Sequence, residues 1–184
     1  MTEYLMRRCA LTLAGLKCAS LFTFPFTDAD QLFSCVGDMN TLLNGKGVYV
    51  IVLRQQGCKA LVYVYRKSRL AEDLAQRGVG EYLRAAGYED GSVAGCLDRL
   101  RNRFEEYEKT GFPHEIGLFL GYPLYDVEGF CAHCGKNHLL CGYWKAYRNV
   151  EAAREIFRRY KACEAAYRRQ FAQGKSIAQL VVAM

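Results

Sequence analysis

Two runs of β-branched and aromatic residues constrain the fold of this chain more than any other feature. They cover residues 48–54 and 60–65, and the five residues between them include Gly57. Two such runs joined by a short loop that contains glycine are typical of a β-hairpin. Neither run alternates polar with apolar residues, so both faces of the hairpin must be covered. The sequence therefore predicts a hairpin at the centre of a sheet, with helices on at least one side.

Helices with one apolar face are predicted around this hairpin. Thr27 or Asp28 can cap a helix that runs to about Leu43. Other helices are expected near the N-terminus and at about 68–76, 79–86 and 150–172, and a further helix is capped by Ser92 and ends at Gly111. A short strand is expected at 19–24. No linker, repeat or low-complexity tract divides the 184 residues. We therefore predict one α+β domain over residues 1–184, with a mixed sheet of four or five strands built around the 48–65 hairpin.

The cysteines and the N-terminus predict a reducing, cytoplasmic setting. The nine cysteines are an odd number, and several fall on apolar helical stripes, where a free thiol packs as a small hydrophobe. Arg7-Arg8 and the apolar residues after them imitate a signal peptide, but Lys17 interrupts the run and a helical period explains it better. No stretch approaches the roughly 18 apolar residues of a membrane span, so no membrane association is expected.

The positive charge of the chain is concentrated near its C-terminus. The net charge is +6, and residues 144–175 alone hold nine basic and three acidic residues. Four of the cations, Arg154, Arg158, Lys161 and Arg168, share one helical face. A basic face can bind phosphates, but a solvated surface with Glu155–Arg159 and Glu164–Arg168 pairs explains it equally simply. Because no nucleic-acid motif accompanies the charge, nucleic acid is not expected as a partner.

A cluster of cysteines and histidines at residues 131–141 has the residue types of a metal site. Cys131 and Cys134 are separated by two residues, and His138 and Cys141 could complete a tetrahedral set for zinc. The spacing in the second half is shorter than in most zinc sites. The alternative is a loop of reduced thiols without metal.

A second hypothesis for the same region is nucleophilic catalysis. Cys141 could act as the nucleophile and His114 as its base, with Glu115 or Asn137 orienting the imidazole. A pair of this kind would act on an acyl or amide bond. The two hypotheses exclude each other, because a thiolate bound to metal is not a free nucleophile.

A third hypothesis is a binding pocket for a planar, anionic molecule. Aromatic rings and cationic or amide groups gather between residues 112 and 147, and such groups recognise this ligand class by stacking and charge-assisted hydrogen bonds. They are His114, Tyr122, Lys136, Asn137, Tyr143, Trp144 and Lys145. The alternative is that these aromatic side chains only pack beneath the 150–172 helix.

The same region resembles an uncharacterised family of anaerobic Gram-positive bacteria, a domain of unknown function. The matching pieces are Phe112–Leu124, with its His-Glu-Ile-Gly and Leu-Gly-Tyr-Pro motifs, Asp126-Val127, Gly129-Phe130, Gly135-Lys136-Asn137, Cys141–Lys145, Tyr147, and Cys9–Lys17 near the start. Leu11 stands where the family usually has proline, and Cys131 and Cys134 lie outside the family pattern. The pattern includes Thr12, Lys17, His114, Glu115, Lys136, Asn137, Tyr143 and Trp144. The resemblance implies a link to iron or redox metabolism, and a protein of that metabolism as a partner.

Taken together, these features predict a cytoplasmic protein that binds a small molecule or assists iron or redox metabolism. We expect residues 112–147 to close against the N-terminal helix, so that Thr12, Lys17, Lys136 and Asn137 bind anionic or amide groups and Trp144 stacks on the ligand. The alternatives are a Cys–His hydrolase or acyl transferase, and a metal-stabilised interaction module that uses the basic helix.

Overall fold

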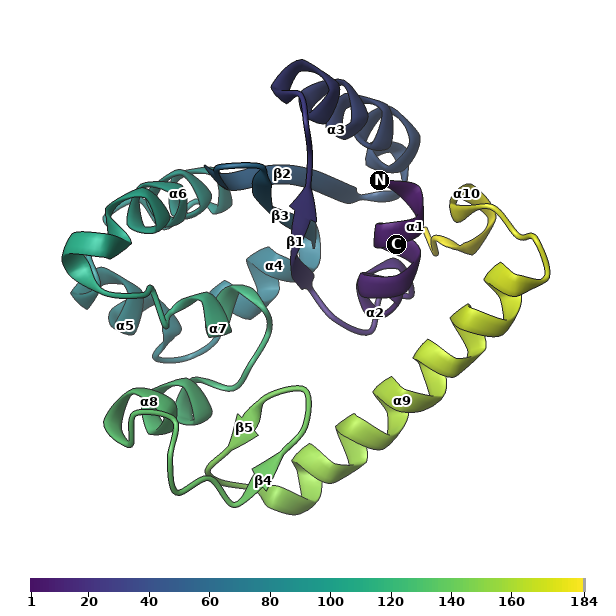
Figure 1. Ribbon diagram of the computed structural model, residues 1–184. Helices are drawn as coiled ribbons and strands as arrows, with labels where there is room; N and C mark the ends of the chain where they lie inside the picture. Colours follow the sequence, from purple (N-terminus) through teal and green to yellow (C-terminus); the bar gives the residue numbers. More distant parts are fainter. Residues whose placement is uncertain (184) are drawn as a thin grey trace.

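A three-stranded antiparallel sheet lies at the centre of the computed structural model, which describes residues 1–183 (Figure 1). Its strands are β1 (Ala19–Pro25), β2 (Val48–Gln56) and β3 (Lys59–Arg66), in the order β1-β3-β2. The predicted hairpin is thus confirmed as β2 and β3, and β3 is the central strand. Tyr63 is paired with Leu21 on one side and with Ile51 on the other, and the register between β2 and β3 shifts between Val52 and Arg54.

The α+β class is confirmed, but the predicted mixed sheet of four or five strands is wrong. Within residues 1–183 every strand pair is antiparallel, and the two remaining strands, β4 (Leu140–Cys141) and β5 (Lys145–Ala146), form a separate sheet. The aromatic run after Cys141 turns back at Gly142 to make this β4–β5 hairpin. The Gly142 N–H donates to the Trp144 carbonyl (3.0 Å) and closes the turn.

Side chains of β3 alternate between two hydrophobic cores, one on each face of the sheet. Tyr63 and Tyr65 belong to the first core, and Val62 and Val64 belong to the second. All four are buried, because both cores are covered by helices. This arrangement explains why the strand has no polar side: each face of a central strand contacts packed helices and not water.

Helices from the middle of the chain cover the first face, and helices from its two ends cover the second. The first set is α4 (Lys67–Leu74), α5 (Val79–Ala85), α6 (Val93–Thr110), α7 (Ile116–Phe119) and α8 (Leu124–Ala132). The second set is α1 (Thr2–Arg8), α2 (Ala10–Leu13), α3 (Ala29–Leu43), α9 (Val150–Ala172) and α10 (Ile177–Leu180), with the 3-10 turn η1 (Asn44–Lys46). Figure 1 shows the long α9 running from the β4–β5 hairpin to α10 beside the N-terminus. Among residues 1–183, no helix is long and apolar enough to cross a membrane.

Capping side chains fix the starts of two of these helices. The Asp28 carboxylate accepts the N–H of Asp30 (3.0 Å), so Asp28 and not Thr27 caps α3. Ser92 accepts the N–H of Gly95 (3.1 Å) at the start of α6. Both interactions satisfy N–H groups that have no partner inside the helix.

Arg66, at the end of β3, is a buried cation that joins four separate segments. It is 1% exposed, and its guanidinium donates to the carbonyl oxygens of Thr12, Leu13 (2.6 Å), Lys46 (3.4 Å) and Val182 (2.8 Å). The first two carbonyls lie at the end of α2, where the helix dipole favours a cation. Each of them also accepts a backbone N–H, from Gly15 (3.1 Å) and from Val182 (3.0 Å). Burial lowers the pKa of Arg66. All four of these acceptors are backbone carbonyls, and none is a carboxylate.

We expect Arg66→Met to destabilise the protein by about 3 kcal/mol or more, because four carbonyls lose a hydrogen bond from a charged donor at once, two of them at buried contacts. The measurement is chemical denaturation followed by circular dichroism. Lys67→Met is the matched control, because Lys67 is the next residue and is exposed. Equal stabilities of the two variants would contradict the role assigned to Arg66.

Candidate functional site

A cavity of about 330 Å³ lies between α7, α8 and the β4–β5 hairpin. We call it the α7–α8 cavity. Its lining residues come from four segments that the chain brings together: Phe112 and His114, Ile116 and Gly117 of α7 with Tyr122 after it, Asp126, Val127 and Phe130 of α8, and Cys141, Gly142, Trp144 and Lys145 of the hairpin. Most of the wall is apolar or aromatic, and the polar groups are few.

The structure brings together five of the residues singled out from the sequence. His114, Tyr122, Cys141, Trp144 and Lys145 all line the α7–α8 cavity. They come from two stretches about 25 positions apart, and the two short helices α7 and α8 fold one stretch against the other. His114 lies directly before α7, and its ring packs near that of Phe130 (5.0 Å between centroids).

Asp126 holds α8 against the β4–β5 hairpin. It is 2% exposed, and its carboxylate accepts the indole N–H of Trp144 (2.8 Å) and the backbone N–H groups of Tyr147 (2.7 Å) and Arg148 (3.3 Å). A buried carboxylate is tolerated when donors satisfy it in this way. The sequence analysis assigned this residue no role in the site, because a lone aspartate on a short helix gives no sign of partners about 20 positions later.

Trp144 forms a wall of the cavity and is not a stacking platform for a ligand. Its ring is 8% exposed, stacks on Tyr122 (5.4 Å, 29°) and makes an edge contact with Phe157 of α9 (4.5 Å). The indole N–H is bonded to Asp126. The expected stacking role is therefore corrected, since the faces of the indole are already covered by protein.

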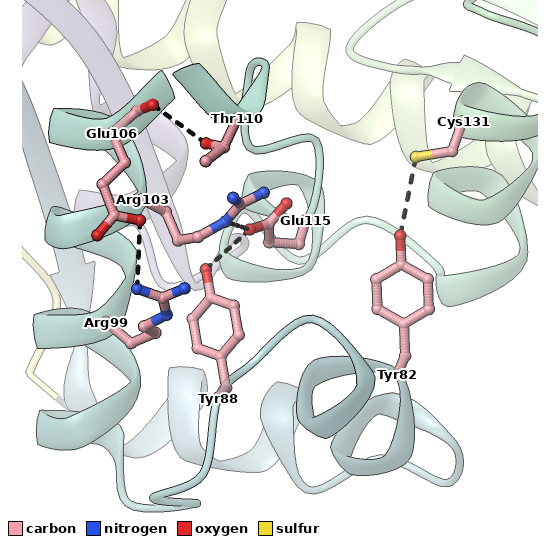
Figure 2. Close-up of polar contacts among 8 residues, drawn as sticks. All are labelled: Tyr82, Tyr88, Arg99, Arg103, Glu106, Thr110, Glu115 and Cys131. Carbon is pink, nitrogen blue, oxygen red and sulfur yellow. Dashed lines mark hydrogen bonds and ion pairs between the residues drawn. The ribbon is translucent and has the colours of Figure 1, made fainter. Parts of the chain in front are cut away.

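Glu115 points away from the cavity, although it follows His114 directly. Its carboxylate accepts hydrogen bonds from Arg103 of α6 (2.9 Å) and from the Tyr88 hydroxyl (3.2 Å) (Figure 2). The residue is 5% exposed, and its charge raises the pKa of Tyr88 in addition to burial. Glu115 thus ties α7 to α6 and is not placed to orient His114.

Lys136 and Asn137 do not reach the cavity. Both are exposed in the turn after α8, and Asn137 adopts a left-handed conformation (φ 58°). The cation that lines the cavity is Lys145, whose ammonium donates to the Gly135 carbonyl (2.7 Å) and lies 5.6 Å from the centre of the Phe130 ring. The expected roles of Lys136 and Asn137 in binding are therefore not supported by their positions.

Lys17 and Thr12 lie behind the cavity wall. The Lys17 ammonium sits 4.9 Å from the centre of the Tyr122 ring, and burial lowers its pKa to about 8. Thr12 is fully buried, and its hydroxyl is bonded to that of Ser20 (2.8 Å). Neither residue lines the cavity, so the N-terminal segment supports the wall through Tyr122 and does not present these groups to a ligand.

Tyr143 faces α9 and not the cavity. Its hydroxyl donates to Glu164 (2.7 Å), and its ring packs against Phe157 and Tyr160. The Glu164 carboxylate, which the sequence predicts to pair with Arg168, is hydrogen-bonded to Tyr143 instead.

The basic face of α9 carries ion pairs with a spacing of three residues instead of four. Arg158 pairs with Glu155 (2.7 Å), and Arg154 pairs with Glu151 (3.7 Å). All four side chains are exposed, so each pair contributes little to stability. The pairs nevertheless neutralise part of the charge that this face presents to solvent.

The four residues expected to bind zinc do not come together. Cys131 lies in α8 with its sulfur near the Tyr82 hydroxyl (3.7 Å), while Cys141 lies on β4 and lines the cavity. Among residues 1–183, no group of three or more His, Cys, Asp or Glu side chains is arranged to hold a metal ion. The turn at residues 133–137 is the reason: it separates the first cysteine pair from His138 and Cys141.

We expect Asp126→Asn to destabilise the protein by about 1.5–3 kcal/mol, because an amide nitrogen would face an N–H donor in place of a charged acceptor. Trp144 is the single tryptophan, so its fluorescence emission should also shift to the red as the hairpin loosens. Glu128→Gln, an exposed carboxylate of the same helix, is the control. An unchanged emission spectrum in Asp126→Asn would show that the hairpin does not need this carboxylate.

Comparison with known proteins identifies the family of this chain. The family described as "Protein of unknown function (DUF3793)" matches residues 5–181. No curated protein and no solved structure matches the chain. Since the match spans nearly all of the chain and includes every element of the cavity, the chain belongs to the DUF3793 family.

Proposed function

We propose that this protein binds a small, planar, anionic molecule in the α7–α8 cavity. The observation that carries the proposal is the lining: aromatic and aliphatic side chains surround a space in which His114, Cys141 and Lys145 supply the polar contacts. Ligand sites in proteins are typically concave and mostly apolar, with a few polar groups that orient the ligand.

The size of the cavity supports a ligand of one or two fused rings. A volume of about 330 Å³ is near the lower end of the range for small-molecule sites, about 300–1,000 Å³. Phe112 and Phe130 offer apolar contact area, and Phe112 is 48% exposed although it lies at the cavity. An apolar ring bound there would remove that surface from water.

The charges around the cavity favour an anion over a cation. Asp126 also lines the cavity, but its two oxygens accept three N–H groups of the protein. Lys145 makes one hydrogen bond, to Gly135, and its ammonium has two further N–H groups. A carboxylate or enolate on the ligand would therefore meet donors from Lys145 and His114.

The test compares 2-naphthoate with its neutral isostere 2-naphthamide by isothermal titration calorimetry. We expect the carboxylate to bind about tenfold more tightly, as one charge-assisted hydrogen bond worth about 1.4 kcal/mol predicts. Lys145→Gln should abolish this preference. Lys136→Gln, an exposed lysine outside the cavity, should leave it unchanged. Equal binding of both probes, or no binding of either, would overturn the proposal.

A second candidate is a Cys–His enzyme, and one observation favours it: His114 and Cys141 line the same cavity. A thiol beside an imidazole can be activated as a nucleophile for acyl transfer. Glu115 is turned toward Arg103, so the imidazole would lack the carboxylate partner that completes such triads.

Alkylation by iodoacetamide distinguishes this candidate, because each relevant thiol lies alone in a tryptic peptide, Cys141 in 137–145 and Cys58 in 55–59. An activated Cys141 should react at least about tenfold faster than Cys58 at pH 7, and His114→Gln should remove the difference. Matching pH profiles for the two thiols, both centred near the ordinary thiol pKa of about 8.5, would eliminate the enzyme candidate.

The cytoplasmic setting and the link to iron or redox metabolism are separate parts of the proposal. They rest on the cysteine content and on the family resemblance, and the α7–α8 cavity does not depend on either.

A further inference from the structure

Cys131 and Cys134 lie at the two ends of a closed turn that follows α8. The Cys134 N–H donates to the Cys131 carbonyl (3.3 Å), and the Gly135 N–H donates to the Phe130 carbonyl (2.9 Å). A four-residue turn of this kind holds its first and last Cα atoms within about 7 Å. Disulfides join cysteines whose Cα atoms are about 4.4–6.8 Å apart. The backbone therefore already brings the two cysteines to bridging range.

The turn holds Cys134 in a conformation that is uncommon for its residue type. Its φ of 50° lies in the left-handed region, which favours glycine, and Gly135 after it has φ 73°. Both thiols are free and exposed, so a dissolved oxidant can reach them. Since the folded chain has already closed the turn, little further entropy is lost when the two sulfurs join.

Tyr82 of α5 distinguishes the two thiols. Its hydroxyl lies 3.7 Å from the Cys131 sulfur (Figure 2). Burial and the neighbouring thiol raise the pKa of Tyr82, so the hydroxyl keeps its proton at neutral pH. It can therefore donate a hydrogen bond to the Cys131 sulfur, and a donor at this position favours negative charge on that sulfur.

We propose that Cys131 and Cys134 are a redox-active dithiol, with Cys131 as the attacking and Cys134 as the resolving cysteine. The oxidant is a low-molecular-weight disulfide. The Cys131 thiolate attacks one sulfur of that disulfide, forms a mixed disulfide and expels one thiolate. The Cys134 thiolate then attacks the Cys131 sulfur and expels the second. The protein gives up two electrons and two protons in total, and the oxidant becomes two thiols.

The dithiol does not depend on the proposed ligand, but it lies beside the proposed ligand site. Phe130 lies next to Cys131 and lines the α7–α8 cavity. Gly135 lies next to Cys134, and its carbonyl accepts a hydrogen bond from the Lys145 ammonium. A disulfide would therefore stiffen the segment that carries part of the cavity wall. The redox chemistry itself requires no ligand in the cavity.

The test uses the full chain, equilibrated with mixtures of reduced and oxidised glutathione, alkylated and digested with trypsin. The peptide 110–136 contains Cys131 and Cys134 and no other cysteine, so loss of two hydrogens from this peptide reports the bridge directly. We expect the bridge to form at a concentration of oxidised glutathione at least about tenfold lower than the one that modifies Cys58, an exposed thiol in a peptide of its own.

Variants assign the two roles. Cys134→Ser should trap glutathione on Cys131, whereas Cys58→Ser should leave the bridge unchanged. Tyr82→Phe should slow bridge formation several-fold, and Tyr125→Phe, a half-buried tyrosine of α8, should not. Mixed disulfides at both cysteines without a mutual bond, formed no faster than at Cys58, would overturn the dithiol. An unchanged rate in Tyr82→Phe would overturn the assignment of Cys131 as the attacking thiol.

Discussion

The buried guanidinium of Arg66 is the contact on which the rest of the architecture depends. It joins the end of β3 to the carbonyl end of α2, to η1 and to the residues after α10. A buried cation is costly unless its donors are satisfied, and here four carbonyls satisfy them. Because these carbonyls belong to segments from both ends of the chain, their positions relative to the central strand are coupled. One side chain thus holds α2, η1 and the residues after α10 against the end of the central strand.

The same strand positions the candidate site from its other face. The Tyr63 hydroxyl and the Cys18 thiol both donate to the carbonyl of Phe119, which ends α7 (2.5 and 3.6 Å). This anchors α7, and with it the wall formed by Ile116 and Gly117. Asp126 then attaches the β4–β5 hairpin to α8. The cavity is thus built from short, irregular segments that are each tied down by one or two buried polar contacts.

Two chemistries lie within a few residues of each other in this region. The α7–α8 cavity has an aromatic wall with a cation and an imidazole, and the turn at its edge carries a pair of exposed thiols. Phe130 and Gly135 connect the two, because each lies next to one of the cysteines and contacts the cavity or its lysine.

The sequence by itself determined the hairpin, the long helices and the covered sheet, because these follow from local propensity and from the period of apolar residues. It also predicted a site within residues 112–147, which stays a prediction. Only the tertiary structure decided which of those residues face the cavity. His114 and Glu115 are neighbours in the chain, yet α7 turns one toward Phe130 and the other toward Arg103. Asp126 and Arg66 have partners that are remote in sequence, and no local pattern identifies a partner that only folding brings into contact.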